Sequence, residues 1–188
     1  MSTSSGSVSP RLHPFPSILR SGVLVLILGV SSVSGVAVAV YPHSYLIYFV
    51  GIVAAALAFT FFKDRYKYGR PTTAQLIAIY VALILGVLLL IGLFVFMPDY
   101  GSRNFLLLMF LIIGIVFVPL SVASGPLMLL LAALCIVNAL LGLWLHSISF
   151  SIFGLVDGVL KIIFGLLMLR ARAVIIPAPA VQADAGIS

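Results

Sequence analysis

Six long apolar runs follow one another between residues 17 and 169 of the chain. They cover residues 17–41, 44–62, 73–97, 104–122, 126–145 and 148–169. Each is close to the ~20 residues that an α-helix needs to cross about 30 Å of hydrocarbon. The pattern predicts an all-α protein, a polytopic membrane bundle of six transmembrane helices.

The composition excludes a water-soluble globule. Of 188 residues, 63% are hydrophobic and 7% are charged, and none is glutamate, whereas about a quarter of a soluble domain is charged. The net charge of +6 does not indicate a nucleic-acid partner, because the basic residues flank the apolar runs and do not line one face. Cys135 is the single cysteine, so an internal disulfide is excluded.

The ends of the chain differ from its centre. Residues 1–16 are rich in Ser and Pro and predict a disordered tail, and residues 173–188 predict a flexible one. The six-helix domain is expected to cover residues 17–172. Within the fourth run, Pro119 removes a helical hydrogen bond, so we expect that helix to kink or end nearby.

Basic residues predict the orientation of the bundle. With six spans, one side carries Arg11, Arg20, Lys63, Arg65, Lys67, Arg70, Arg170 and Arg172, and the opposite loops carry only Arg103. Positive charge concentrates on the cytoplasmic side, so both termini are expected on the cytoplasmic side of the cytoplasmic (inner) membrane, N-in and C-in. An alternative makes the first run a signal peptide cleaved at Ala37-Val38-Ala39, although its apolar core exceeds the usual ~7–15 residues.

Small residues predict where helices pack, because close approach drives helix association in lipid. At 100° per residue, the sixth run places five side chains in a stripe about 100° wide: Gly154, Asp157, Gly158, Lys161 and Gly165. The first run has a second zone of small residues, in which Ser31 and Gly35 are one turn apart; its members are Gly29, Ser31, Ser32, Ser34 and Gly35. They predict a second packing face or, alternatively, a serine-lined substrate path.

Two charges lie near the middle of the last run, where each costs roughly 2.5–3.5 kcal/mol on insertion scales. Asp157 and Lys161 have the i,i+4 spacing of an intrahelical pair, with the acid first. Asn138, in the fifth run, is predicted at a similar depth and can donate to the carboxylate or accept from the ammonium.

Three interpretations of this intramembrane polar cluster stay open at this point. It is a polar staple that fixes helix register, a proton- or ion-linked transport site, or a catalytic site. An intramembrane aspartyl protease is excluded, because it needs two membrane aspartates and only Asp157 lies at depth. The sequence predicts no catalytic residues, no metal ligands and no cofactor.

The loop between the second and third runs is basic and aromatic. We expect it to contact lipid headgroups through Lys63, Arg65, Lys67 and Arg70. The alternative is a topology signal with an aromatic belt. Membrane lipids are the predicted partners, together with a homo-oligomer or a larger membrane complex, and no nucleic acid is expected.

Three motifs carry a family resemblance over residues 66–169. They are Tyr68-Gly69-Arg70-Pro71, Cys135-Ile136-Val137-Asn138-Ala139-Leu140 and Asp157-Gly158-x-x-Lys161. On these residues the chain resembles an uncharacterised family of small bacterial six-helix membrane proteins. It is also similar to the acid-resistance HdeD-like membrane proteins in span number and in its Gly-Leu-rich helices. Neither resemblance implies an established activity.

Together these features predict a non-enzymatic, multi-pass membrane protein with a structural or accessory role. The alternative is a small transporter or channel that uses Asp157, Lys161 and Asn138.

Overall fold

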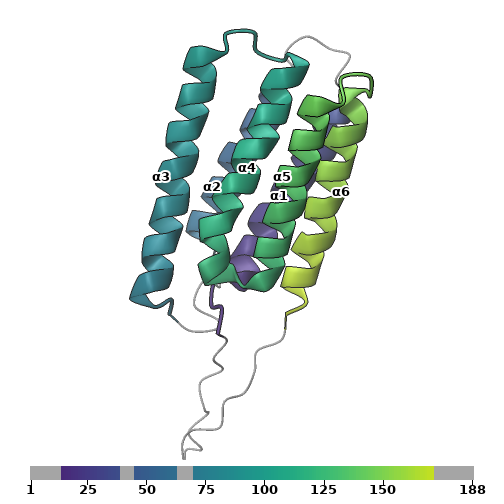
Figure 1. Ribbon diagram of the computed structural model, residues 1–188. Helices are drawn as coiled ribbons and strands as arrows, with labels where there is room; N and C mark the ends of the chain where they lie inside the picture. The colour runs from purple at the N-terminus through teal and green to yellow at the C-terminus, as the bar shows by residue number, and fades with distance from the viewer. Residues whose placement is uncertain (1–13, 39–44, 63–69, 172–188) are drawn as a thin grey trace, which may run out of the picture.

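The structure is a computed structural model that describes residues 14–38, 45–62 and 70–171. These residues form six α-helices and no strand, which confirms the all-α prediction (Figure 1). The helices are α1 (Ile18–Ala37), α2 (Tyr45–Phe61), α3 (Thr73–Phe96), α4 (Arg103–Ser124), α5 (Pro126–Trp144) and α6 (Phe150–Leu169). Each helix lies within one of the six predicted runs or overlaps it almost completely.

The lengths of the helices suit a membrane. Five of them (α1, α3, α4, α5 and α6) are long and apolar enough to cross one. α2 has 17 residues, at the short end of the range of about 17–25 that spans a bilayer. The start of α1 and the end of α6 lie at the same end of the bundle (Figure 1), as an even number of crossings requires.

Local chemistry explains where several helices begin. The Thr72 hydroxyl accepts from the Gln75 backbone N–H, and the Gln75 side chain accepts from the Thr72 N–H. This reciprocal capping box satisfies two N–H groups that have no partner within the first turn of α3. Gly125 separates α4 from α5 at φ 95°, a conformation that glycine adopts without steric cost.

Pro119 does not end α4, which continues to Ser124. The prediction was a kink or an end near the proline: the helix does not end at Pro119, and the kink stays a prediction. Proline removes one backbone donor, but packing of the following turn can hold a helix past it. That turn is well packed, since Leu120 and Ala123 are buried.

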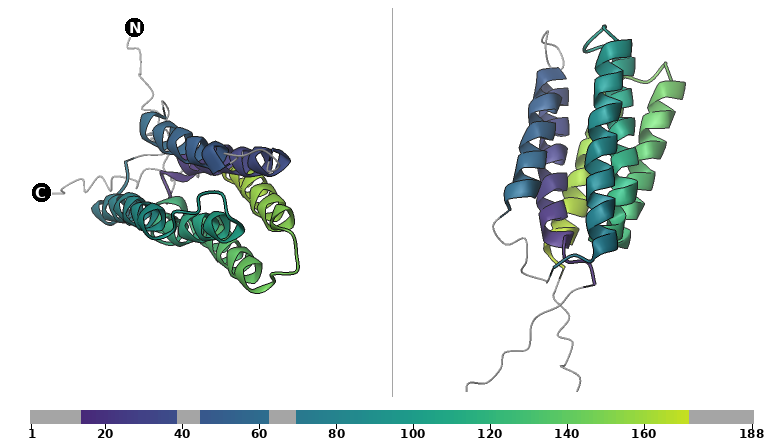
Figure 2. Two further views of the ribbon diagram at one scale, coloured as in Figure 1. Left: turned by 90° about the horizontal axis from the view of Figure 1, so that it is seen from above. Right: turned by 90° about the vertical axis from the view of Figure 1, so that its left-hand side faces the viewer.

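The six helices form two rows of three. α2, α1 and α6 pack side by side in one row, and α3, α4 and α5 in the other (Figure 2). The rows join where α5 packs against α6. At the opposite edge the backbones of α2 and α3 stay apart, so one edge of the bundle is closed and the other is open.

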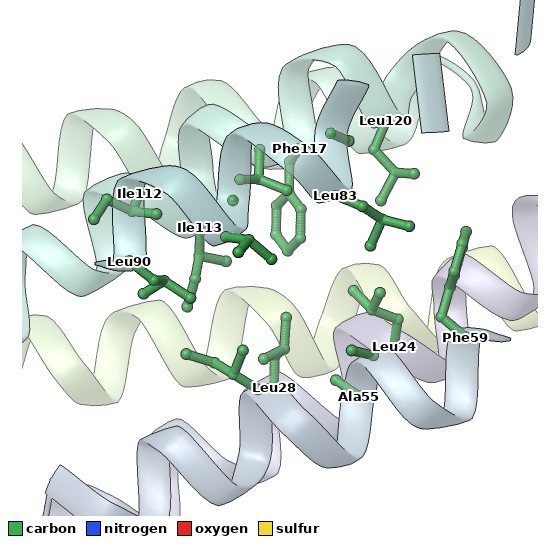
Figure 3. Close-up of a pocket in the computed structure, with 16 residues that line it drawn as sticks. Leu24, Leu28, Ala55, Phe59, Leu83, Leu90, Ile112, Ile113, Phe117 and Leu120 are labelled. Carbon is green, nitrogen blue, oxygen red and sulfur yellow. The ribbon is translucent and has the colours of Figure 1, made fainter. Parts of the chain in front are cut away.

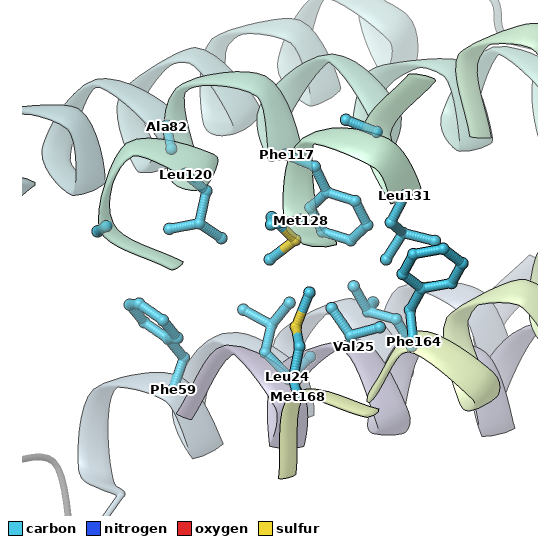
Figure 4. Close-up of a cluster of buried hydrophobic side chains, with 14 of the residues drawn as sticks. Leu24, Val25, Phe59, Ala82, Phe117, Leu120, Met128, Leu131, Phe164 and Met168 are labelled. Atoms are coloured by element: carbon cyan, nitrogen blue, oxygen red, sulfur yellow. The ribbon is translucent and has the colours of Figure 1, made fainter. Parts of the chain in front are cut away.

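Buried apolar side chains fill the space between the rows. At the end where the chain enters α1, Leu24 and Val25 face Phe117, Leu120 and Met128 of the other row (Figure 4). A second cluster lies toward the other end. It is built around Phe105, Leu107, Met109 and Phe110, all of which are completely buried.

Several predictions fall on residues outside the described part of the chain. They concern residues 1–13 of the predicted N-terminal tail, the whole predicted C-terminal tail (173–188), and the loop residues Lys63, Arg65 and Lys67. Just before α1, Phe15 is described, and it packs against Gly125 between α4 and α5.

Candidate functional site at the α1–α6 contact

Glycines on both helices set the distance between α1 and α6. Gly22 and Gly29 are seven residues apart on α1, as are Gly158 and Gly165 on α6. A methyl group added to Gly29 would come within 2.9 Å of the Gly158 carbonyl oxygen, and one added to Gly165 within 3.0 Å of the Gly22 carbonyl oxygen. Backbones approach this closely only where side chains are absent. We call this contact the glycine seam.

The predicted ion pair lies beside the glycine seam. Lys161 Nζ donates to Asp157 Oδ2, and both side chains are 0% exposed. Helical side chains point toward the N-terminus of their helix, so the lysine stem reaches back one turn to the aspartate. Both residues occupy the middle of α6 (Phe150–Leu169). The arrangement places two opposite charges together, with no net charge, at the centre of the bundle.

Ser32 ties this ion pair to the neighbouring helix. Its hydroxyl donates to Asp157 Oδ2 at 3.0 Å, from a position on α1 that is 3% exposed. Ser32 lies three residues after Gly29, on the same face of α1. Asp157 Oδ2 therefore accepts one hydrogen bond within α6 and one across the seam.

Side chains from three more helices enclose the ion pair. Lys161 Nζ lies 5.1 Å from the centroid of the Phe110 ring on α4, in the range of a cation–π contact. The Tyr48 ring of α2 meets Phe110 edge-on at 5.5 Å. Cys135 of α5 interacts electrostatically with both charges.

Two polar atoms near the ion pair have no hydrogen-bond partner among the described groups. They are Asp157 Oδ1 and the Tyr48 hydroxyl, both buried. Tyr48 also interacts electrostatically with Asp157. Unsatisfied buried polar groups cost about 1–3 kcal/mol each, so this side of the carboxylate is the least stabilised part of the site.

Asn138 faces α6 but does not bond to the ion pair. Its Nδ2 donates to the Phe153 carbonyl at 3.0 Å, one turn before Asp157. As its predicted depth suggested, Asn138 contacts α6. However, the side chain satisfies a backbone group, and Asp157 takes Ser32 as its neighbour.

The remaining predicted packing residues divide between two contacts. Gly154 meets the Val36 side chain of α1, where an added methyl group would approach to 2.5 Å. Ser31 and Gly35 instead face α2: the Ser31 hydroxyl donates to the Ile47 carbonyl at 3.1 Å, and the Tyr48 ring covers Gly35. α1 thus uses one small-residue face for α6 and another for α2.

Of the four basic residues predicted to contact headgroups, the structure describes one. Arg70 is exposed just before α3. At the other end of the bundle, Arg103 has a role that its sequence context does not reveal. Its Nη2 donates to the carbonyls of Gly142 and Leu145 at 2.6 and 2.8 Å, where a cation stabilises the C-terminus of α5.

Two apolar pockets lie along α2 and α3, away from the ion pair. Figure 3 shows the first, which side chains of α1 and α4 also line. The two pockets have volumes of about 140 and 680 Å³. Their walls do not include Asp157, Lys161 or Ser32. In residues 14–38, 45–62 and 70–171, no group of three or more His, Cys, Asp or Glu side chains is arranged to hold a metal ion.

Ser32 was predicted only as a member of a small-residue packing zone, and its bond to Asp157 was not predicted. The sequence does carry a signal for it, because Gly22 and Gly29 repeat the seven-residue spacing of Gly158 and Gly165. That shared spacing pairs α1 with α6 and selects the face on which Ser32 lies. No comparable signal brings Phe110 or Tyr48 to the ion pair, because apolar and aromatic residues occur throughout the chain.

The fold and the site define a class: an all-α bundle of apolar helices of membrane-crossing length, with one enclosed ion pair. The chain belongs to the family of unknown function DUF6609, whose profile matches residues 19–174. This match confirms the predicted resemblance to an uncharacterised family, while the bacterial origin and the similarity to HdeD-like proteins stay predictions. No curated protein and no solved structure gives a significant match.

Proposed function

We propose that this chain is a structural or accessory component of the cytoplasmic membrane, without enzymatic activity, and that its ion pair is a polar staple. One observation carries the proposal: Asp157 and Lys161 are both 0% exposed and neutralise each other. A pair of this kind fixes the register of α6 against α1 through Ser32. Buried polar groups are best attested in such a register role.

The energetics of insertion support this role. Two central charges remove roughly 5–7 kcal/mol from the insertion free energy of α6 on translocon scales, close to what its apolar residues supply. Insertion of α6 is therefore more favourable when a partner helix provides hydrogen bonds to its polar face. The glycine seam and Ser32 supply that partner.

The proposed orientation is N-in and C-in, with the first helix retained. The distribution of basic residues supports the orientation. Retention of α1 is supported by its position between α2 and α6 and by the Ser32 bond. We also propose contacts between the basic loop and anionic lipids, and assembly as a homo-oligomer or within a larger membrane complex.

The double substitution Asp157→Leu with Lys161→Leu tests the staple. Apolar replacement of a complete buried pair is often neutral or stabilising by about 1–4 kcal/mol. We expect the double variant to insert and to keep the wild-type free energy of unfolding within about 1 kcal/mol, measured in detergent micelles. Reconstituted in liposomes with an internal pH-sensitive dye, wild-type protein should give no proton flux above protein-free liposomes.

The second candidate is a small proton- or ion-linked transporter or channel that uses the same cluster. Asp157 Oδ1 and the Tyr48 hydroxyl, both buried without a hydrogen-bond partner among the described groups, favour it, because carboxylates inside a membrane can form proton relays. A wild-type flux that disappears in a folded Asp157→Leu/Lys161→Leu protein would establish this candidate and overturn the staple. Tyr48→Phe, which removes only the hydroxyl, should then reduce the flux as well.

A further inference from the structure

The two apolar pockets adjoin each other along α2 and α3, and together we call them the α2–α3 groove. They share four wall residues: Ile52, Ala56, Val87 and Leu90. The only polar wall side chain is Thr60, whose hydroxyl donates to the Ala56 carbonyl of its own helix at 2.8 Å. The walls of this α2–α3 groove therefore offer no free hydrogen-bonding group and suit a hydrocarbon ligand.

The groove is closed at one end. The rings of Phe49 on α2 and Phe94 on α3 meet edge-on at 5.9 Å, and both belong to its walls. From Phe59 to Phe49 the groove follows α2 for ten residues, about 15 Å at 1.5 Å per residue. That length is half of the ~30 Å hydrocarbon core, the depth of one leaflet.

The other end of the groove carries positive charge. Phe59 is a wall residue, and the Arg20 guanidinium lies over its ring, 4.3 Å from the centroid. Arg20 is in the first turn of α1 (Ile18–Ala37), where a long basic side chain reaches the membrane interface. Arg70 is exposed just before α3 begins, at this same end of the bundle (Figure 1).

We infer that the α2–α3 groove binds one anionic phospholipid from the leaflet on the N-terminal side of the bundle. A tail of the lipid lies along the apolar walls and ends below the Phe49–Phe94 pair. Its phosphate is held at the Arg20 guanidinium, whose Nη2 also donates to the Ser17 hydroxyl at 3.2 Å. Charge complementarity selects an anionic lipid, because a guanidinium binds phosphate strongly and basic residues at a membrane surface attract anionic headgroups.

The inference rests on the proposed membrane setting and on no other part of the proposed function. Purified full-length chain is exchanged into nanodiscs of equal parts phosphatidylglycerol and phosphatidylcholine, and lipids retained on the released protein are counted by native mass spectrometry. We expect one retained phosphatidylglycerol per chain. Ala56→Phe should abolish its retention by filling the groove, and Arg20→Gln should lower the preference for phosphatidylglycerol about fivefold.

Two matched controls should behave as the wild type. Val50→Phe adds the same ring on α2 at a position that is 63% exposed and outside the groove. Arg170→Gln removes one charge after α6, at the same end of the bundle. The unaltered chain provides a test that does not depend on a variant folding. A phosphatidylglycerol with a photoreactive diazirine in its tail should crosslink to wall residues of α2 and α3.

Three results would overturn the inference. Equal retention of both lipids by wild type and Arg20→Gln would show non-selective tail contact only. Crosslinks distributed over all outer helix faces would lead to the same conclusion. A dimer that Ala56→Phe disrupts would show that the groove holds a second copy of this chain. If alkaline extraction removes the chain from membranes, both the proposed membrane setting and the proposed phospholipid site are wrong.

Discussion

Two places where helices lie beside each other in the bundle are built in opposite ways. At the α1–α6 contact, glycines bring two backbones together and an ion pair with Ser32 lies beside them. At the α2–α3 edge, large apolar side chains line a groove and the helices stay apart. Helix association in this protein therefore depends on small residues and hydrogen bonds, as expected where lipid removes the hydrophobic driving force between helices.

A glycine is not sufficient by itself to bring helices together. Gly92 on α3 has nothing within 4 Å of the position where a Cβ would stand, whereas Gly158 on α6 would meet both Gly29 and Val33 of α1. The seam forms because both helices present glycines at the same spacing. Four substitution experiments test whether the two contacts differ in this way.

Removing one charge should have the largest effect. Asp157→Leu leaves the Lys161 ammonium buried without its carboxylate, and breaking a buried pair costs about 3–5 kcal/mol. We expect a loss of that size in the free energy of unfolding, measured by denaturant titration in detergent micelles. Lys161→Leu should cost a similar amount. Losses below about 1 kcal/mol in both single variants would contradict the view of the pair as a staple.

Adding a methyl group to the glycine seam should lower the free energy of unfolding by the next largest amount. In Gly158→Ala, the new methyl group would lie 2.7 Å from Val33 Cγ2 and 3.0 Å from the Gly29 carbonyl oxygen. Overpacking of this kind costs about 1–3 kcal/mol, so the same titration should show a loss in that range. The matched control is Gly92→Ala, which should lose nothing. An equal loss in both variants would show that the seam is not special.

Loss of the bond across the seam should have a moderate effect. Ser32→Ala removes the donor to Asp157 Oδ2, and interhelical hydrogen bonds in membranes contribute about 0.6–1.7 kcal/mol. Unfolding measurements should show a loss within that range. Ser34→Ala, on the exposed side of the same helix, should leave stability unchanged. A Ser32→Ala protein as stable as wild type would mean that the glycines alone hold α1 to α6.

The groove should tolerate truncation best. Val87→Ala shortens a wall side chain that is 56% exposed, and changes at such positions are usually within about 0.5 kcal/mol. Val25→Ala, the same change at a position that is 0% exposed, should cost several times more in the same assay. Similar losses at the two positions would indicate that the groove is packed against another part of the protein in solution.

Much of the fold follows from local sequence patterns. The lengths of the apolar runs predict six helices, and the i,i+4 spacing predicts the Asp157–Lys161 pair. Both depend on neighbours along one chain segment. The expectations for Pro119 and Asn138 depended on contacts with other helices. Packing carries α4 past the proline, and Asn138 bonds to the Phe153 carbonyl.

The sequence by itself determined the class of fold, the polar face of α6 and the identity of its two charges. Hydrophobic length and helical periodicity act within about 20 residues, so they can be read without knowing the neighbours. Only the tertiary structure decided that Ser32 completes the ion pair and that α2 stands apart from α3. Those outcomes depend on which helix faces meet. The close approach of Gly29 to Gly158 and of Gly22 to Gly165 determines which faces meet, and these glycines are too far apart in the chain for any local pattern to relate them.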